Sequence, residues 1–434
     1  MNIRAKILFG LMLIFSGVQS LAQNKLDKVD NYDLIKSYLN DPLWEKRDVY
    51  DAGHFLMIPL HYSYVTNDED LKLSFTIFFN RFLSEYKHSF SNNSNNIQRL
   101  QFSYLISQYL KLHLKYENCN YGELQNKLLH FLKEEVKYFW IDADANNWKY
   151  SRFIKYQFKG FKDRIDWKLN TTLLDNSNFY RVIIDSERFL IAIAADLKYI
   201  SRRNIDVPNK KKDIGQIDSI VSVGFKIYKE RVSLEHNEFI FQKGYWSKHR
   251  DYKYAGCETL ECIEKGVNRV SAISEDTSHS LRLPLLISSL EDGMELAVDK
   301  KYFKKLKEKL AFQLLNKIIR EKENNCQCFY PTNYLDGSNG YYRYNYETHK
   351  NEGYGPFELS ETFKIGWWAF LEDNQISNLY TIINSNLKNN IPCEFLYKDK
   401  TKRERHPIVA NRFNNNLYVI ITKMASELIT NTNN

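Results

Sequence analysis

The segment from Glu275 to Leu286 carries reactive side chains at helical spacing. Asp276, His279 and Arg282 recur three residues apart, which would place them along one flank of a helix. A carboxylate beside a histidine orients the ring and raises its basicity, and a guanidinium can hold a substrate carboxylate through two parallel hydrogen bonds. We therefore interpret these residues as catalytic candidates. The alternative is a capping cluster at a helix start with Arg282 in a salt bridge.

Two histidines precede this segment in a stretch predicted to be helical over Asp51–Tyr64. His54 and His61 would share one face about 10 Å apart, at roughly 1.5 Å per residue. One metal ion cannot bind both, so we expect polar groups along a cleft, with His54 as a catalytic candidate and His61 as a substrate-binding one. The alternative is a pair of buried, hydrogen-bonded histidines.

Long irregular stretches at 232–275 and 324–356 are rich in Tyr, Gly, Asn and His. Because disordered segments are poor in aromatics, we expect ordered loops that cover a cleft. Tyr and Trp faces stack on sugar rings while the ring hydroxyls stay free for hydrogen bonds; the alternative is that the loops are held by their own aromatics. The substrate-binding candidates in these loops are Trp246, Tyr252, Tyr254, Asp336, Tyr342 and Arg343, and Glu358, just beyond, is a further candidate catalytic carboxylate.

The elements that must position these residues are helices. Apolar residues recur with helical period in about a dozen segments. They are Tyr32–Leu39, Asp51–Tyr64, Leu71–Tyr86, Ile97–Leu114, Leu124–Trp140, Tyr180–Ile200, Ile214–Tyr228, Leu283–Leu290, Tyr302–Ile319, Phe357–Leu371, Ile376–Leu387 and Leu417–Ile429. Short and long connectors alternate, with a further irregular stretch at 142–178. The pattern predicts an all-α fold, an α/α toroid of helical hairpins with long aromatic-rich loops at one mouth; the rival is an irregular helical bundle or solenoid.

Composition agrees with one large helical domain. The chain has 434 residues, and a hydrophobic fraction of 43% supports a sizeable core and excludes dominant disorder. Only 16 Gly and 8 Pro argue against an all-β sandwich, which needs many tight turns. The formal charge of +8 is mild. Basic clusters at Lys210–Lys212 and Lys402–Arg405 are solvated loops or points of attraction for a polyanion.

The N-terminus has the layout of a secretory signal peptide over residues 1–22. Arg4 and Lys6 precede a largely apolar run, and small residues stand before Gln23. The run is too short to span a bilayer, so we expect a secreted or periplasmic protein, a single domain over 23–434, with no stable membrane span after signal removal. In that compartment Cys257 and Cys262 can form a small disulfide loop.

Several classes of site are not expected. The cysteines lack the paired spacing of a zinc site, and we predict no metal and no cofactor. Nucleotide loops, nucleophile elbows and zinc-protease motifs are absent. No nucleic-acid partner is expected, because the chain has no binding motif for one.

The chain resembles secreted bacterial α/α-toroid proteins of the six-hairpin, carbohydrate-active type. The resemblance rests on the helix count, the polar-to-apolar helix entry at Glu275–Pro284, the Tyr-Trp loop at 245–254 and the Gly-Trp-Trp helix at 366–368. It implies a polysaccharide or oligosaccharide partner. In that group hydrolases use two carboxylates, and lyases use Tyr and His to remove a proton beside a uronic carboxylate. The Asn-Asn-His-type motif of some alginate lyases and the C-terminal β-sandwich of heparinase-like lyases are absent.

The sequence therefore predicts a polysaccharide lyase or glycoside hydrolase acting on an acidic glycan. A hydrolase would pair Asp276 with Glu358 or Asp336, whereas a lyase would use Arg282, a histidine base and a loop tyrosine acid. The alternatives are a non-catalytic glycan-binding protein and an envelope interaction protein. The last would use the Tyr-rich loops as a protein interface.

Overall fold

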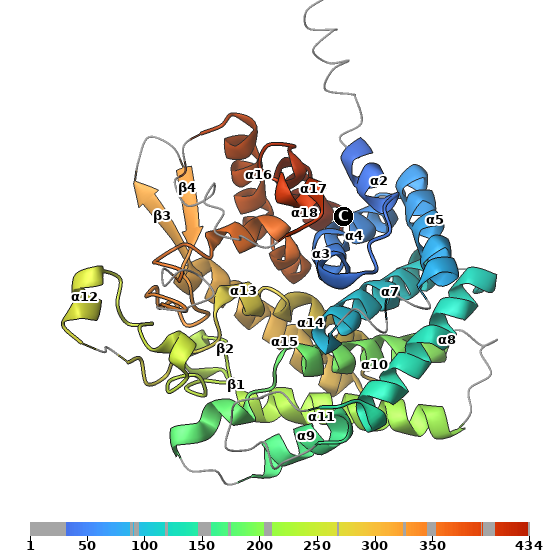
Figure 1. Cartoon of the computed structure of the whole chain (residues 1–434), viewed down its shortest axis with the longest axis horizontal. Helices are drawn as coiled ribbons and strands as arrows, with labels where there is room; N and C mark the ends of the chain where they lie inside the picture. Colours follow the sequence, from blue (N-terminus) through green and yellow to red (C-terminus); the bar gives the residue numbers. More distant parts are fainter. Residues whose placement is uncertain are drawn as a thin grey trace, which may run out of the picture.

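The computed structural model describes most of the chain, and most of that part is helical (Figure 1). The described residues are 32–86, 90, 95–117, 120–145, 158–171, 175–203, 211–266, 269–323, 327–344, 353–391, 393 and 404–432. The all-α prediction is confirmed at this level. The expected signal peptide over 1–22 lies outside the described residues. In the ranges that the structure describes, no helix combines the length and apolarity needed to cross a bilayer.

Longer helices form the body of the fold. They are α2 (Asp33–Leu39), α3 (Lys46–Phe55), α4 (Met57–Val65), α5 (Glu69–Glu85), α7 (Asn96–Tyr116), α8 (Glu123–Lys137), α9 (Gly160–Asn170), α10 (Asp185–Arg203), α11 (Lys211–Arg231), α14 (Leu283–Gly293), α15 (Ala297–Gln313), α16 (Asn374–Lys388) and α18 (Leu417–Thr432). The short helices are α12 (Leu260–Glu264), α13 (Thr277–Ser280) and α17 (Pro407–Ala410).

The expected helix over Asp51–Tyr64 is two helices. α3 ends at Phe55 and α4 begins at Met57, with Leu56 between them. Pro59 explains the interruption, because proline has no N–H to donate to the carbonyl four residues earlier and its ring clashes with that carbonyl. His54 and His61 therefore lie on different helices, and the expected shared face does not form.

The expected helix over Phe357–Leu371 is also wrong. Two short 3₁₀ segments, Ser360–Ile365 and Trp367–Leu371, replace it. Gly366 separates them with a φ of 91°, a left-handed conformation that favours glycine. A Cβ there would lie 2.8 Å from the Cγ1 atom of Ile58, so the close approach to α4 also requires glycine.

The long helices pack in an order that returns to its start. α4 contacts α7, α7 contacts α10, and α10 contacts α14. α14 meets the Trp367–Leu371 segment, which contacts α18, and α18 packs against α4. The helices α5, α8, α11, α15 and α16 each pack against a neighbour from this series (Figure 1).

The irregular connections are ordered by short strands and bridges. β1 (Val232–Ser233) pairs with β2 (Ile240–Phe241), and β3 (Ile319–Glu323) pairs with β4 (Gln327–Pro331), both antiparallel. Isolated bridges at Tyr254–Tyr341, Asp276–Tyr334 and Tyr342–Tyr354 join the two aromatic-rich stretches to each other and to α13. The described parts of the two stretches are therefore connected to each other and to the residue that caps α13.

Two disulfides cross-link the irregular connections among the described residues. Cys257 is bonded to Cys262, as the sequence analysis expected, and Cys328 is bonded to Cys393. The second bridge links β4 to the segment after α16. Each one holds a connection that lacks a long helix of its own.

Candidate functional site

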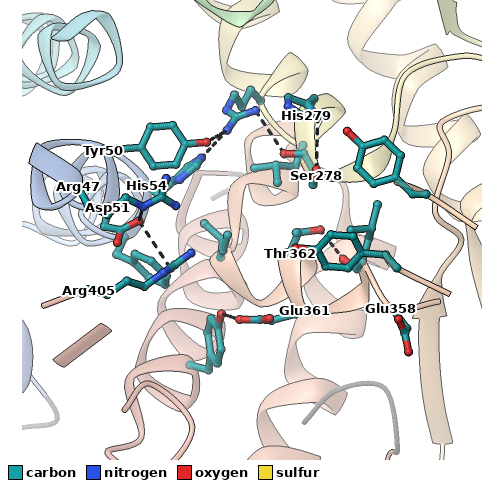
Figure 2. A pocket seen from close by; sticks show the side chains of 18 of the residues that line it. Arg47, Tyr50, Asp51, His54, Ser278, His279, Glu358, Glu361, Thr362 and Arg405 are labelled. Atoms are coloured by element: carbon teal, nitrogen blue, oxygen red, sulfur yellow. Dashed lines mark hydrogen bonds and ion pairs between the residues drawn. The ribbon is translucent and has the colours of Figure 1, made fainter. Parts of the chain in front are cut away.

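A cavity of about 190 Å³ lies where α3, the α13–α14 junction and the aromatic-rich loops meet (Figure 2). Its lining combines guanidinium, imidazole, carboxylate and phenol groups. The lining residues are Arg47, Tyr50, Asp51, His54, Phe55, Ser278, His279, Leu281, Arg282, Tyr342, Arg343, Tyr354, Glu358, Leu359, Glu361, Thr362, Ile365, Arg405 and Tyr418. The structure thus brings His54, His279, Arg282 and Glu358 to one pocket, with Asp276 directly behind His279.

Asp276 orients His279. It caps α13 by accepting from the Ser278 N–H at 3.1 Å, and its Oδ2 atom lies 2.7 Å from His279 Nδ1. The Tyr252 hydroxyl donates to the same Oδ2 at 2.8 Å. Asp276 is fully buried, whereas a third of the His279 side chain is exposed. The carboxylate therefore fixes the orientation of the His279 ring, whose side chain lines the pocket.

His279 is suited to donate a proton. Burial lowers the pKa of His279, but the Asp276 and Asp185 carboxylates outweigh burial and raise the pKa above its ordinary value. Asp185 Oδ2 lies 3.9 Å from Nε2. The folded protein therefore stabilises the imidazolium form of His279 relative to a free histidine side chain.

Arg282 connects the two sides of the pocket. Arg282 is the N-cap residue of α14, and Pro284 lies in the first turn, so the helix starts where the proline predicts. Its guanidinium donates to Asp185 Oδ2 at 2.7 Å, to the Tyr50 hydroxyl at 2.6 Å and to His54 Nε2 at 2.9 Å. Only 1% of Arg282 is exposed.

The expectation that Arg282 grips a substrate carboxylate is therefore wrong. Both of its terminal nitrogens already donate to protein groups, so neither remains for a bidentate clamp. Arg282 instead orients the groups around it, as the salt-bridge alternative required.

A buried network of ion pairs holds Asp185, the carboxylate that accepts from Arg282. Arg188 donates to both oxygens of Glu275, at 2.8 and 2.7 Å, and also pairs with Asp185. Asp185 stands at the start of α10. Since each carboxylate is paired, its burial is compensated. Burial raises the pKa of Asp185, but Arg282 and Arg188 lower the pKa by more than burial raises it, so Asp185 stays ionised.

His54 does not have the form that a base requires. A guanidinium can only donate, so His54 Nε2 must be the acceptor from Arg282, and its lone pair is occupied. Burial and the surrounding Arg282, Arg47 and Arg405 hold the pKa of His54 well below its usual value. Its backbone carbonyl accepts from Trp367 Nε1 at 3.0 Å. His54 is neutral and positions Arg282.

The aromatic candidates of the first loop lie outside the pocket. Trp246 stacks on Tyr252 with ring centroids 4.9 Å apart, and both are buried in a small core beneath the loops. Tyr254 meets the Tyr344 ring edge-to-face. The faces of Trp246 and Tyr252 contact other rings, so the expected stacking of these two residues on sugars is not supported. The alternative, a loop held by its own aromatics, describes them better.

Two more candidates lie away from the cavity. His61 is buried against the Phe370 ring, with Nε2 3.1 Å from Gln108 Oε1. Asp336 accepts from the backbone N–H groups of Ser274 at 2.7 Å and Ser338 at 2.8 Å, which stabilises the turn. Neither residue lines the pocket, so their expected substrate-binding roles there are not supported.

The remaining loop candidates line the pocket but are engaged. Tyr342 is almost fully buried, and Arg343 donates to Asp251 at 3.0 Å. Glu358 accepts from the Gly355 N–H at 2.6 Å. A pair of Asp276 with Glu358 or Asp336 would not place two carboxylates in the cavity, because of these three residues only Glu358 lines it.

Sequence reasoning missed several lining residues that come from distant segments. Arg47 and Tyr50 lie on α3, more than 220 residues from Arg282, and no local pattern marks them. Arg405 belongs to the basic cluster Lys402–Arg405, whose attraction for polyanions was the one available signal. Glu361 accepts from Arg412 and Tyr418 at the cavity wall.

In the described parts of the chain, no group of three or more His, Cys, Asp or Glu side chains is arranged to hold a metal ion. No protein-family model, curated protein or solved structure matches the chain.

Proposed function

We propose that the protein is an enzyme that cleaves an acidic polysaccharide by β-elimination in this pocket. The observation that carries the proposal is the oriented His279–Asp276 pair beside Tyr50, Arg282 and further guanidinium groups in a single cavity. Elimination beside a uronic carboxylate needs a group that removes the C5 proton and a group that protonates the departing glycosidic oxygen.

The acid in this proposal is His279. Its raised pKa favours the protonated ring, and a third of its side chain is exposed where it lines the pocket. As the glycosidic bond breaks, that proton moves to the leaving oxygen and His279 becomes neutral. Asp276 keeps the tautomer and the ring orientation throughout.

The base in this proposal is Tyr50. Its hydroxyl oxygen accepts from Arg282 at 2.6 Å, so the guanidinium stabilises the phenolate that remains when Tyr50 gives its proton to solvent water. The phenolate then takes the C5 proton of the uronate. Arg282 lies between Tyr50 and the Asp185 carboxylate near His279, which keeps base and acid in fixed relation.

The fold and compartment in this proposal are an α/α toroid and an extracytoplasmic site. The closed order of helix contacts supports the toroid, and the bridges that connect the two aromatic-rich stretches support loops that gather at one mouth. Two disulfides favour an oxidising compartment, in agreement with the signal-peptide layout of residues 1–22.

The test is turnover of a panel of acidic and neutral polysaccharides by the purified protein. We expect ultraviolet absorbance of unsaturated uronate and reducing ends to rise together, and His279→Gln and Tyr50→Phe each to lower the rate at least about 100-fold. The matched controls His130→Gln on α8 and Tyr116→Phe at the end of α7 replace exposed residues and should keep the wild-type rate.

The outcomes separate the hypotheses. Reducing ends without unsaturated uronate would mean hydrolysis and would contradict elimination. Binding without any turnover, by a folded protein, would favour the non-catalytic glycan-binding alternative.

A further inference from the structure

The Asp276 carboxylate accepts hydrogen bonds from two distant parts of the chain. His279 Nδ1 lies 2.7 Å from Asp276 Oδ2, and the Tyr252 hydroxyl donates to the same oxygen at 2.8 Å. On the other oxygen, Oδ1, the carboxylate accepts from the Ser278 N–H at 3.1 Å and from the Ser278 hydroxyl. Asp276 is fully buried. Tyr252 and His279 therefore share one oxygen of a buried carboxylate.

Tyr252 acts on this carboxylate as a neutral donor. An ionised carboxylate only accepts hydrogen bonds, so the proton of the contact belongs to the phenol. Burial first, and the Asp276 charge next, hold the pKa of Tyr252 well above its ordinary value, so the hydroxyl keeps that proton. Tyr252 is 3% exposed and does not line the cavity. It therefore reaches the pocket through Asp276 and not by contact with a ligand.

The aromatic-rich loops hold the Tyr252 ring in place. Its face stacks on Trp246, with centroids 4.9 Å apart and planes 16° apart, and its ring meets Tyr342 at 5.4 Å. The preceding residue is fixed as well, because Arg343 donates to the Asp251 side chain at 3.0 Å and to its backbone carbonyl at 3.0 Å. The loops therefore keep the Tyr252 hydroxyl on the carboxylate.

We propose that Tyr252 is a positioning residue for His279, acting through the Asp276 carboxylate that both side chains contact. Its hydroxyl draws part of the carboxylate's charge away from the imidazole ring, so the ring holds its proton less tightly than Asp276 alone would make it. The aromatic loop then serves the proton donor from behind the pocket. The link to turnover rests on the proposed function, whereas the protonation of His279 is measurable without substrate.

Charged groups on neighbouring elements also act on His279. Burial is the largest cause and lowers the pKa of His279, Asp276 and Asp185 raise it, and Arg282 lowers it. Further charged or titratable groups that act on His279 or on Asp276 are His54 on α3, Glu275 before α13 and Arg343 in the second aromatic-rich stretch. Tyr252→Phe keeps all of these groups, so a change in the pKa of His279 would come from the lost hydroxyl.

The experiment is an NMR titration of the His279 ring protons in the full chain, with His279→Gln identifying the resonance. Tyr252→Phe should raise the pKa of His279 by about half a unit or more, because the carboxylate regains the charge that it shared with the hydroxyl. Tyr334→Phe is the matched control. It removes a phenol hydroxyl from the same buried cluster, one that donates to the Tyr341 carbonyl at 2.9 Å, and should leave the pKa of His279 unchanged.

Two further variants separate positioning from a general structural role. In an Asp276→Asn background, Tyr252→Phe should no longer raise the pKa of His279, because the carboxylate that couples the two side chains is gone. Where Tyr252→Phe does not fold, Tyr252→3-fluorotyrosine keeps both the ring and the hydroxyl. Its more acidic phenol donates more strongly, so it should lower the pKa of His279, a change opposite in sign to that of Tyr252→Phe.

An unchanged pKa of His279 in folded Tyr252→Phe would overturn the positioning role. An equal rise in Tyr334→Phe or in the Asp276→Asn background would overturn it too, as would 3-fluorotyrosine without a lowered pKa.

The pH–rate profile tests the proposed function separately. Activity that needs protonated His279 is lost as pH rises through its pKa, so the alkaline limb should move to higher pH in Tyr252→Phe. A raised pKa with an unmoved limb would keep the positioning role and refute His279 as the acid. A raised pKa without turnover of any polysaccharide would keep the role and refute the elimination, whereas turnover with an unchanged pKa would do the opposite.

Discussion

Replacing Asp276 with asparagine tests whether its carboxylate sets the protonation of His279. Asparagine is nearly isosteric and still caps a helix start well, but it has no charge for the ring 2.7 Å away. A hydrogen bond to a charged group contributes about 1.5–3 kcal/mol, and one pKa unit corresponds to about 1.36 kcal/mol. We therefore expect the pKa of His279 to fall by roughly 1–2 units in Asp276→Asn.

The assay is an NMR titration of the histidine ring protons, with His279→Gln identifying the resonance. Activity that depends on protonated His279 is present below its pKa and is lost as pH rises through it. The alkaline limb of the rate profile should therefore move to lower pH in Asp276→Asn by the same amount. Asp373→Asn is the matched control, because Asp373 caps α16 with no histidine beside it. An unchanged pKa of His279 in a folded Asp276→Asn variant would refute the reasoning.

Three further predictions concern stability, each measured by chemical or thermal unfolding. Gly366→Ala should cost about 1–3 kcal/mol, because φ is positive and the new methyl would overlap an α4 side chain; wild-type stability would show that the turn adapts. Glu187→Gln should cost about 3–5 kcal/mol, since it removes the buried carboxylate that pairs with both Arg164 and Lys168, whereas Glu123→Gln, an exposed control, should leave the midpoint in place. Replacing both Cys328 and Cys393 with serine should cost about 4 kcal/mol by releasing a 65-residue loop, and an unchanged midpoint would contradict the disulfide.

The pH dependence of stability follows from the pKa shifts of His279 and Asp276. The raised pKa of His279 gives a contribution that is complete below about pH 6.5 and is lost as pH rises through the folded-state value. Burial raises the pKa of Asp276, but His279 and Ser278 lower it well below the ordinary value. Its contribution is therefore complete above about pH 4 and is lost on acidification.

Local sequence patterns predicted the helices that have a regularly spaced apolar face. Most expected helices are present within a few residues, because each has an apolar face of regular period. Helix α9 was missed within the stretch expected to be irregular. Its buried face includes Arg164 and Lys168, which pair with Glu187 of α10, so charged residues occupy positions where the pattern requires apolar ones.

In the candidate site, too, local spacing was predictable and tertiary packing was not. The proximity of Asp276 and His279 was predictable, since three residues separate them at a helix start. The aromatic side chains were misassigned for a physical reason. Trp246 and Tyr252 gain more from mutual stacking and burial beneath the loops than from exposure in a cleft, and a sequence motif does not distinguish these outcomes.

The sequence does not show which arginine of the pocket has which role, because all have the same side chain. Only the residues that each arginine contacts in the fold distinguish their roles. Arg282 was predicted to bind the ligand because it is close to His279 in the sequence. It is buried and donates to three side chains of the protein, so it orients those groups instead. Arg47 and Arg405 carried no catalytic pattern, yet both line the cavity and both lie near the buried Asp51 carboxylate. Proximity to His279 in the sequence therefore identified a residue of the pocket but not its role, because the role depends on the partners that the fold brings to it.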